Sequence, residues 1–368
     1  MSSEGITYAS SGVDTAAGDR AVELMKEAVG KTHGPEVLGG VGAFAGLFDA
    51  SALKDYRRPL LASSTDGVGT KIVIARAMGI HDTIGQDLVA MVVDDIVVCG
   101  AKPLVMTDYI ACGRVVPERI ADIVRGIAEG CLMADTALVG GETAEHPGVM
   151  EPDDYDVAGA AIGVVEADAL LGPDRVREGD VVVAMASSGL HSNGYSLVRS
   201  VMAHAGWTLD RHVADLGRTV GEELLEPTRI YAKLCVELAG SVPGLHAFSH
   251  VTGGGLAANL ARVIPAGLAA TVARDAWQLP VIFDALAGAG QVPWHDLEST
   301  LNMGVGMVAV VSASDADSVI SASTAAGVPS WELGAVIADD ARASSADVVR
   351  GAKGVQGGAV YLSGAYRA

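Results

Sequence analysis

The sequence has few aromatic residues and no long uninterrupted apolar segment. Phe, Trp and Tyr make up 4% of its 368 residues, so smaller side chains must fill most of the interior. Ala, Val, Leu and Gly suit closely packed layers of helices and strands. No run of about 18 apolar residues is present, which argues against a membrane-spanning helix. The first ten residues lack the features of a secretion signal, so we expect a cytoplasmic protein without a membrane partner.

Positive charge and paired cysteines are also scarce. The chain has 25 Lys and Arg against 45 Asp and Glu, a formal net charge of -20. Nucleic-acid phosphates bind to basic surfaces, so we expect no nucleic-acid partner. An anionic substrate would have to be held by local cations, backbone amides or a metal ion. The four cysteines form no C-x-x-C motif, which favours buried reduced thiols over disulfides.

Segments with helical and strand periodicity alternate along the chain, which predicts a mixed α/β fold. A polar, turn-rich stretch over 171–180 marks the expected boundary between two α/β domains. The first domain is expected over 1–170, the second over 171–345, and a tail with one strand-like segment over 346–368. The expected helices are 16–29, 82–98, 117–134, 195–205, 227–238, 256–263 and 314–325. The expected strands are 59–64, 104–111, 136–139, 157–165, 181–186, 245–251 and 305–311.

The segment Ser64-Thr65-Asp66-Gly67-Val68-Gly69-Thr70-Lys71 is the strongest local motif. Its glycines allow the backbone to turn closely around a ligand, and exposed amides can bind phosphate oxygens. Asp66 is a candidate Mg²⁺ ligand and Lys71 a candidate phosphate contact. The alternative is a strand-to-helix turn in which Asp66 caps the helix. A carboxylate and a lysine around two glycines favour the functional interpretation.

Three acids lie on the apolar helix expected over 82–98. At 3.6 residues per turn, Asp87 and Asp94 lie within about 20° of each other, and Asp95 about 80° further round. Acids on such a helix are costly unless they are exposed, paired or bound to metal. A solvent-facing acidic stripe is the commoner arrangement. The many apolar neighbours here favour a metal role for at least one acid.

Three more glycine-containing segments follow expected strands. Residues 140–145 place Glu142 beside flexible backbone, although such a segment also forms ordinary turns. Residues 187–194 gather hydroxyls, an amide and the His191 imidazole ahead of a helix, which suits sugar and phosphate groups. Residues 250–255 contain three consecutive glycines, which suit either a phosphate-binding turn or a tight connection that needs a positive φ. The glycine-rich stretch 39–46 lacks dinucleotide-loop spacing and predicts a flexible flap instead.

Together these segments resemble the phosphoribosylformylglycinamidine cyclo-ligases, which produce aminoimidazole ribonucleotide. The resemblance extends in order from residue 8 to about residue 337. It implies a homodimer of two α/β domains whose N-terminal sheets pair across the interface. It also implies ATP and Mg²⁺ at the N-terminal domain, with the substrate formylglycinamidine ribonucleotide toward the C-terminal domain. The matching segments are 8–18, 35–37, 39–40, 65–71, 81–91, 140–145, 154–159, 187–199, 227–231, 250–255 and 304–307.

The resemblance also implies roles for individual residues. Catalysis would involve His191, Asp66 and Lys71, and the metal would be held by Asp66, Asp95 and Glu142. The nucleotide-binding positions would be Lys26, Asp66, Gly67, Gly69, Thr70, Lys71, Asp95, Gly140, Gly141, Glu142 and Thr143. The substrate-binding positions would be Ser188, His191, Ser192, Asn193, Gly194, Thr252, Gly253 and Gly254. Two residues depart from the family pattern: Asp94 stands where Asn is usual, and His146 where Met is common.

The implied reaction is ATP-dependent ring closure in purine synthesis, and two other classes of function compete with it. Thiamine-monophosphate kinase and selenophosphate synthetase share the acidic and glycine motifs of the N-terminal half. The segments 191–194 and 252–255 favour the cyclo-ligase over these two enzymes. A nucleotide-binding dimer without turnover is the other alternative, and Asp66, Lys71, Asp95 and Glu142 argue against it. The residues leave open whether His191 transfers a proton or orients the substrate.

Overall fold

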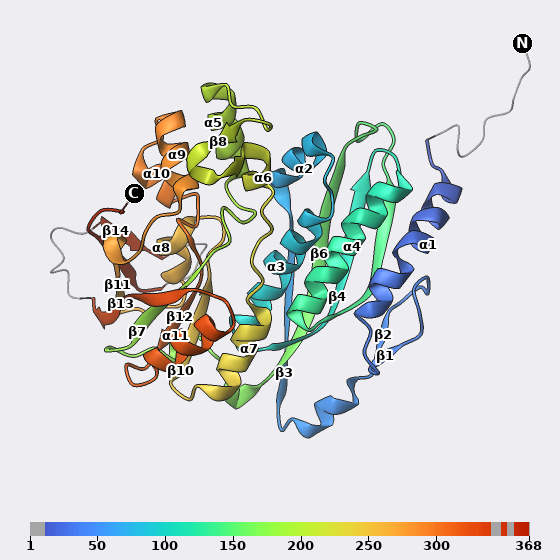
Figure 1. The fold of residues 1–368 in the computed structure, drawn as a ribbon. Helices are drawn as coiled ribbons and strands as arrows, with labels where there is room; N and C mark the ends of the chain where they lie inside the picture. The colour runs from blue at the N-terminus through green and yellow to red at the C-terminus, as the bar shows by residue number, and fades with distance from the viewer. Residues whose placement is uncertain (1–11, 340–346, 352–356, 368) are drawn as a thin grey trace, which may run out of the picture.

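The computed structural model describes residues 12–339, 347–351 and 357–367, which form two sheets with packed helices (Figure 1). The expected mixed α/β class is confirmed. In the N-terminal part, a four-stranded sheet has the order β3-β6-β4-β5, and only the β4–β5 pair is parallel. Its strands are β3 (Pro59–Gly67), β4 (Lys102–Cys112), β5 (Ala137–Glu145) and β6 (Tyr155–Glu166). Two short strands, β1 (Val37–Leu38) and β2 (Leu47–Phe48), pair with each other beside the flap.

Helices cover one face of the four-stranded sheet. They are α1 (Thr15–Lys31), α2 (Ile72–Met78), α3 (Thr83–Val97) and α4 (Pro117–Ala134). α3 packs against β3 and β6, and α1 packs against α4 (Figure 1). α1 begins where the Asp14 carboxylate accepts hydrogen bonds from Ala16 and Ala17, a normal N-cap. The opposite face of the sheet is open to solvent at Leu61, Tyr109 and Ile162.

The C-terminal part contains a seven-stranded mixed sheet of order β10-β12-β7-β13-β11-β15-β14. Its strands are β7 (Val181–Ala186), β10 (Leu245–His250), β11 (Leu268–Ala273), β12 (Val305–Val311), β13 (Ser330–Ala338), β14 (Asp347–Arg350) and β15 (Ala359–Ser363). The short strands β8 (His212–Val213) and β9 (Arg218–Thr219) pair separately. The helices are α5 (Tyr195–Ala205), α6 (Val220–Leu224), α7 (Ala232–Ser241), α8 (Gly255–Leu260), α9 (Val281–Gly290), α10 (Trp294–Glu298) and α11 (Ala316–Ala325). Every residue of β12 is buried, so this strand lies in the core.

The structure shows how the tail expected over 346–368 meets the second domain. β14 and β15 belong to the seven-stranded sheet, and β15 runs parallel to β11. Beyond β15, Tyr366 packs against Trp277 and Trp294, which ties this segment to the domain. Sheet pairing thus joins the described part of the expected tail to strands of the second domain, and the domain bounds stay a prediction. Residues 340–346, part of the expected boundary, lie outside the described residues.

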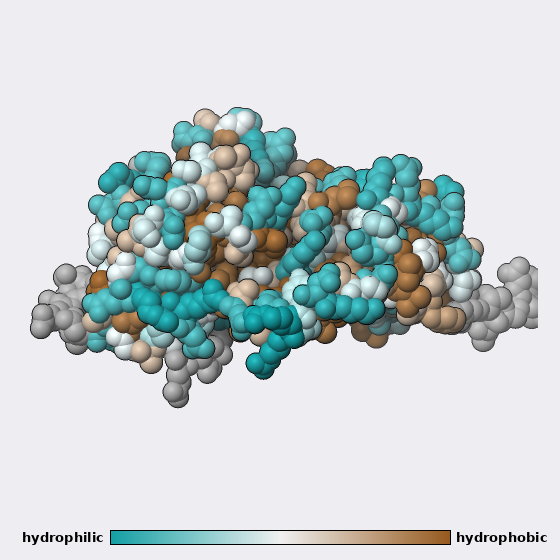
Figure 2. Space-filling model, turned by 90° about the horizontal axis from the view of Figure 1, so that it is seen from below, coloured by the Kyte–Doolittle hydropathy of each residue, from teal (hydrophilic) through white to brown (hydrophobic). Residues whose placement is uncertain are grey.

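The surface is consistent with the composition. Figure 2 shows hydrophilic residues over much of the lower face, with smaller hydrophobic areas between them. None of the described helices is long and apolar enough to cross a membrane.

Candidate active site

Loops of the C-terminal domain meet β3 and α3 where the two domains touch. The loops 187–194 and 252–255 lie side by side, because a Cβ on Gly253 would be 3.3 Å from Asn193 Oδ1. The Thr70 and Ser196 hydroxyls are 3.3 Å apart across the boundary. A cavity of about 300 Å³, which we call the domain-boundary cavity, opens here. Its polar lining includes Ser63, Ser64, Asp95, Ser249, His250, Asn259 and Arg262.

His250 and Asp95 form a hydrogen-bonded pair in the domain-boundary cavity. His250 Nδ1 lies 2.8 Å from Asp95 Oδ1, and the imidazole is buried whereas the carboxylate is half exposed. Burial opposes protonation of His250, but the bond to Asp95 and the charges of Asp94, Asp95 and Asp66 raise its pKa above the ordinary value. Asp66 and Asp95 therefore both act electrostatically on His250, and their joint metal role stays a prediction.

His191 is almost completely buried and adopts a left-handed backbone conformation, with φ of 61°. Its Nε2 accepts a hydrogen bond of 3.2 Å from the Ser188 backbone N–H, so Nδ1 carries the proton of the neutral ring. This Nδ1–H forms no hydrogen bond with any residue in the described part of the chain. Burial, followed by the charges of His250 and Lys71, lowers the pKa of His191 well below 6.5. The ring is therefore a neutral N–H donor at physiological pH.

The other two acids of α3 bind backbone groups of the C-terminal domain. Asp87 Oδ1 accepts hydrogen bonds from the Thr228 N–H, at 2.8 Å, and the Thr228 hydroxyl, at 2.6 Å. Both oxygens of Asp94 accept from the Tyr231 N–H, at 3.0 and 3.1 Å, at the start of α7. The metal role favoured for at least one acid on this helix is thus not supported for Asp87 or Asp94. Their partners are amides and a hydroxyl instead, together with the Lys71 ammonium in the case of Asp87.

Asp94→Asn should make stability less dependent on pH. Burial raises the pKa of Asp94 to about 7, so this carboxyl binds more protons in the folded protein than in the unfolded chain. Stability is then lost as pH rises from about 4 to about 7, by up to about 1.4 kcal/mol per pH unit. An asparagine keeps an acceptor for Tyr231 but has no charge to bury. Denaturant unfolding with EDTA at several pH values should show that the free energy of unfolding of the variant rises relative to that of wild type as pH rises. Parallel profiles of the two proteins against pH would contradict this.

Lys71 does not lie where the sequence led us to expect. Its side chain is 0% exposed, and its ammonium lies 2.9 Å from Asp87 Oδ1. The same ammonium donates to the His191 carbonyl, at 3.1 Å, and to the Glu226 carbonyl, at 2.6 Å. An ammonium has three N–H donors, so none is left for a phosphate oxygen. The expected phosphate contact of Lys71 is therefore corrected to a set of bonds inside the protein.

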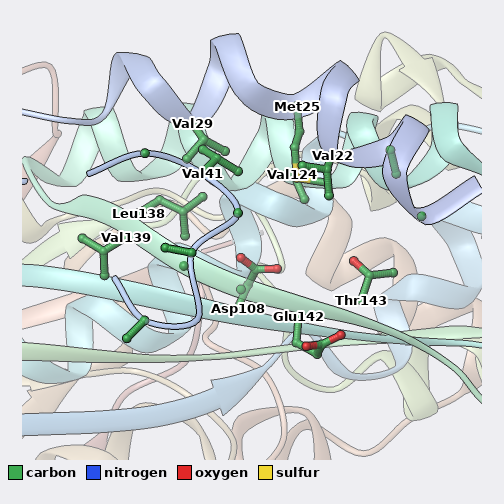
Figure 3. Close-up of a pocket in the computed structure, with 18 residues that line it drawn as sticks. Val22, Met25, Val29, Val41, Asp108, Val124, Leu138, Val139, Glu142 and Thr143 are labelled. Atoms are coloured by element: carbon green, nitrogen blue, oxygen red, sulfur yellow. The ribbon is translucent and has the colours of Figure 1, made fainter. Parts of the chain in front are cut away.

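A second cavity, of about 280 Å³, lies between the flap, α1 and β5 (Figure 3). We call it the flap cavity. Val22, Met25 and Val29 of α1 and Val124 of α4 form its apolar side, and Asp108 and Thr143 contribute side-chain oxygens (Figure 3). The Glu142 side chain points to the other face of the sheet (Figure 3). Four expected nucleotide-binding residues line it: Gly140, Gly141, Glu142 and Thr143. Lys26 is beside it on α1, half exposed and paired with Glu23 at 2.6 Å.

The three expected metal ligands do not come together within one chain. Asp66 is opposite Gly159 and Asp108 opposite Gly141 in the sheet register, whereas Glu142 is opposite Tyr109. Because side chains alternate between faces, Asp66 and Glu142 lie on opposite faces of the sheet. Three strand spacings also separate them, roughly 14 Å. No cluster of three metal-ligating side chains occurs among residues 12–339, 347–351 and 357–367.

Sequence reasoning missed two charged residues of these cavities. Asp108 is in β4 under the flap, and burial raises its pKa to about 7. Arg262 follows α8 and lines the domain-boundary cavity, and it forms no ion pair with a described residue. The signal for Asp108 was an acid at an inward-facing position of a strand. No sequence pattern indicated Arg262, because only the packing of α8 against β10 brings this residue to the domain boundary.

The comparisons with known proteins bear on both domains. Residues 49–165 match the AIR synthase related protein N-terminal domain, and residues 177–345 match its C-terminal domain. A phosphoribosylformylglycinamidine cyclo-ligase of Lachnospira eligens is 47% identical over 90% of this chain and 98% of its own length. Another from Anaeromyxobacter sp. (strain K) is 49% identical over 94% of this chain and 99% of its own length. The chain belongs to the phosphoribosylformylglycinamidine cyclo-ligase family.

Solved structures of more distant proteins share the fold. A thiamine-monophosphate kinase from Stenotrophomonas maltophilia aligns over 94% of this chain and 96% of its own, with a TM-score of 0.67 and 19% identity. The hydrogenase maturation protein HypE in complex with ATP aligns over 98% of this chain and 95% of its own, with a TM-score of 0.60 and 17% identity. At these identities the likeness concerns the fold, whereas the cyclo-ligases match in sequence over about nine-tenths of the chain.

Proposed function

We propose that this enzyme uses ATP to close the ring of formylglycinamidine ribonucleotide, giving aminoimidazole ribonucleotide, ADP and phosphate in purine synthesis. The observation that carries the proposal is 47–49% identity to named cyclo-ligases over about nine-tenths of the chain. A cytoplasmic location follows from this role.

The formyl oxygen of the substrate is a poor leaving group, so the reaction must begin by activating it. Transfer of the ATP γ-phosphoryl group to the formyl oxygen would give an iminophosphate. The ribose-bearing amidine nitrogen would then attack the formyl carbon, and the C–O bond would break to release phosphate. The protein must position these groups and stabilise charge on the phosphoryl oxygens. A neutral imidazole such as His191 supplies one fixed N–H donor through Nδ1.

The two cavities support a division of labour. The flap cavity combines an apolar side with glycine backbone and oxygen acceptors, which suits the base and ribose of a nucleotide. The domain-boundary cavity offers Arg262 and His250 to an anionic ribonucleotide, in a chain that is otherwise strongly acidic. The glycine turn 252–255 follows His250 directly in the chain. Asp66 and Asp95 offer the carboxylate oxygens that Mg²⁺ prefers, and a bound Mg²⁺ would neutralise phosphate charge.

A homodimer would cover the open face of the four-stranded sheet. Leu61, Tyr109 and Ile162 expose apolar surface on this face, and Glu142 shares it with Tyr109. Pairing of two such faces would bury this surface and bring Glu142 to the interface. Light scattering at micromolar concentration should therefore give twice the 37.4 kDa chain mass.

Two substitutions test which face pairs. Ile162→Asp should reduce the particle to one chain, because it places a charge in the proposed interface. Val281→Asp on α9 is the matched control, since these two side chains are 42% and 43% exposed. A wild-type mass of one chain, or equal behaviour of the two variants, would contradict the interface.

Turnover tests the reaction directly. The protein should convert formylglycinamidine ribonucleotide, ATP and Mg²⁺ into aminoimidazole ribonucleotide and ADP in equal amounts. Thiamine monophosphate and selenide, offered separately with ATP, should give no phosphorylated product. Product from either of these, and none from the ribonucleotide, would replace the cyclo-ligase with a related kinase or synthetase.

A further inference from the structure

The buried pair of Lys71 and Asp87 joins the two domains. Lys71 ends the short helix over Gly69–Lys71, five residues after Asp66, and Asp87 is on α3. Both belong to the N-terminal domain, yet most of their other partners are C-terminal. The Lys71 ammonium donates to the carbonyls of His191 and Glu226, and Asp87 Oδ1 accepts from the Thr228 amide and hydroxyl.

The two C-terminal segments held by this pair are also bonded to each other. The Ser188 hydroxyl donates to the Pro227 carbonyl at 2.6 Å, and the Ser192 and Thr228 hydroxyls are 3.1 Å apart. The loop that carries His191 and the segment 226–228 therefore form one hydrogen-bonded unit. Lys71 and Asp87 bind to both halves of it, so they set where the unit lies relative to β3 and α3.

Stability alone does not account for a charged pair at this place. Both side chains are completely buried, and removing two charges from water opposes the gain from their attraction. Well-packed apolar side chains often serve as well in such positions. Directed hydrogen bonds do something that apolar contacts cannot, because they fix the orientation of a particular peptide group. Here that group is the carbonyl of His191, whose backbone has a positive φ that few non-glycine residues adopt.

We propose that Lys71 and Asp87 are positioning residues that hold the His191 loop in place against the Asp66 strand. The pair contacts neither reacting group. It acts through the His191 peptide on one side and through the short connection from Lys71 back to Asp66 on the other. The catalytic consequence rests on the proposed function, whereas the effect on the loop does not.

The double variant Lys71→Met/Asp87→Asn tests this without leaving a buried unpaired charge. The asparagine keeps an acceptor for Thr228, so the bonds lost are those to His191 and Glu226. We expect kcat for ring closure to fall by roughly 10²-fold, the loss that displacement of a reacting group by about 1 Å can cause. ATP affinity should be unchanged. Amide hydrogen exchange at residues 188–192 should become faster.

A matched control removes a different ion pair near the same helix. Arg76 of α2 pairs with Asp154, and both side chains are partly exposed. Arg76→Met/Asp154→Asn should leave both kcat and exchange at residues 188–192 as in wild type. Thr228→Val is a second test that keeps the charged pair, and removes only the hydroxyl that joins Asp87 to Ser192. It should also speed exchange at Ser192.

The outcomes separate the proposal from its alternatives. Wild-type kcat and wild-type exchange in the double variant would overturn the positioning role. Loss of ATP affinity without a change in loop exchange would also overturn it, and would return Lys71 to the nucleotide site. Should the double variant fail to fold, unchanged exchange at Ser192 in Thr228→Val would overturn the proposal. If wild type does not close the ring, the proposed function fails, and the exchange measurement still decides the positioning role.

Discussion

Asp66→Asn should fold normally and lose most of its ATP-dependent turnover. Asp66 is the second-last residue of β3, on the sheet face that packs against α3, and together with Asp95 it raises the pKa of His250. Loss of a charge that binds a metal ion should remove several kcal/mol of transition-state stabilisation. This corresponds to a decrease in kcat of at least roughly 10²-fold. The measurement is steady-state formation of ADP and aminoimidazole ribonucleotide.

Asp156→Asn is the matched control for this substitution. Asp66 Oδ1 accepts from the following N–H, of Gly67, at 2.7 Å, and Asp156 Oδ1 accepts from Val157 at 2.9 Å. Both substitutions keep an acceptor for that amide. Only Asp66→Asn should lose turnover and the dependence of turnover on Mg²⁺ concentration. Wild-type turnover in a folded Asp66→Asn protein would remove Asp66 from the metal site.

His191→Ala should lower ring closure strongly and leave ATP binding nearly intact. The imidazole offers a buried Nδ1–H at the domain boundary, away from the flap cavity. A missing fixed donor or a misplaced substrate would each decrease the rate by roughly 10²-fold or more. ATP affinity by calorimetry and kcat at saturating ATP separate the two effects. Weaker ATP binding with normal ring closure would contradict the division of labour between the cavities.

The pH profile decides what His191 contributes. Because burial lowers its pKa well below 6.5, the ring stays neutral from about pH 6 to about pH 9. The alanine variant should therefore lose the same factor at every pH in this range. His191→Asn is the better-tolerated companion, because asparagine accepts a positive φ more readily than alanine. Loss of one limb of the profile in both variants would instead make His191 the proton-transfer group.

Several elements were predictable because their apolar periodicity is strong. The helix α4 and the strand β12 have the bounds expected from sequence, and α5 does as well. β11, β13 and α9 were missed, because short apolar runs rich in Ala and Gly do not distinguish helix, strand and loop. The helix expected from residue 227 begins only at Ala232. The amides of Thr228 and Tyr231 instead donate to Asp87 and Asp94.

The sequence by itself determined the α/β class, the family and the grouping of 187–194 and 250–255 as loops after strands. Local patterns suffice for the class and the loops, since periodicity and turn residues act over short distances. The family follows from the resemblance of an ordered series of segments. Tertiary structure decided the partners of each charge. Lys71 was expected to bind phosphate, but its acceptors at His191 and Glu226 lie 120 and 155 residues further along the chain. Spacing could place Asp87 and Asp94 on one side of a helix, whereas only packing shows that this side faces amides of the other domain. A carboxylate that binds a metal and one that binds an amide look alike in sequence, because the difference is the group that folding brings to it.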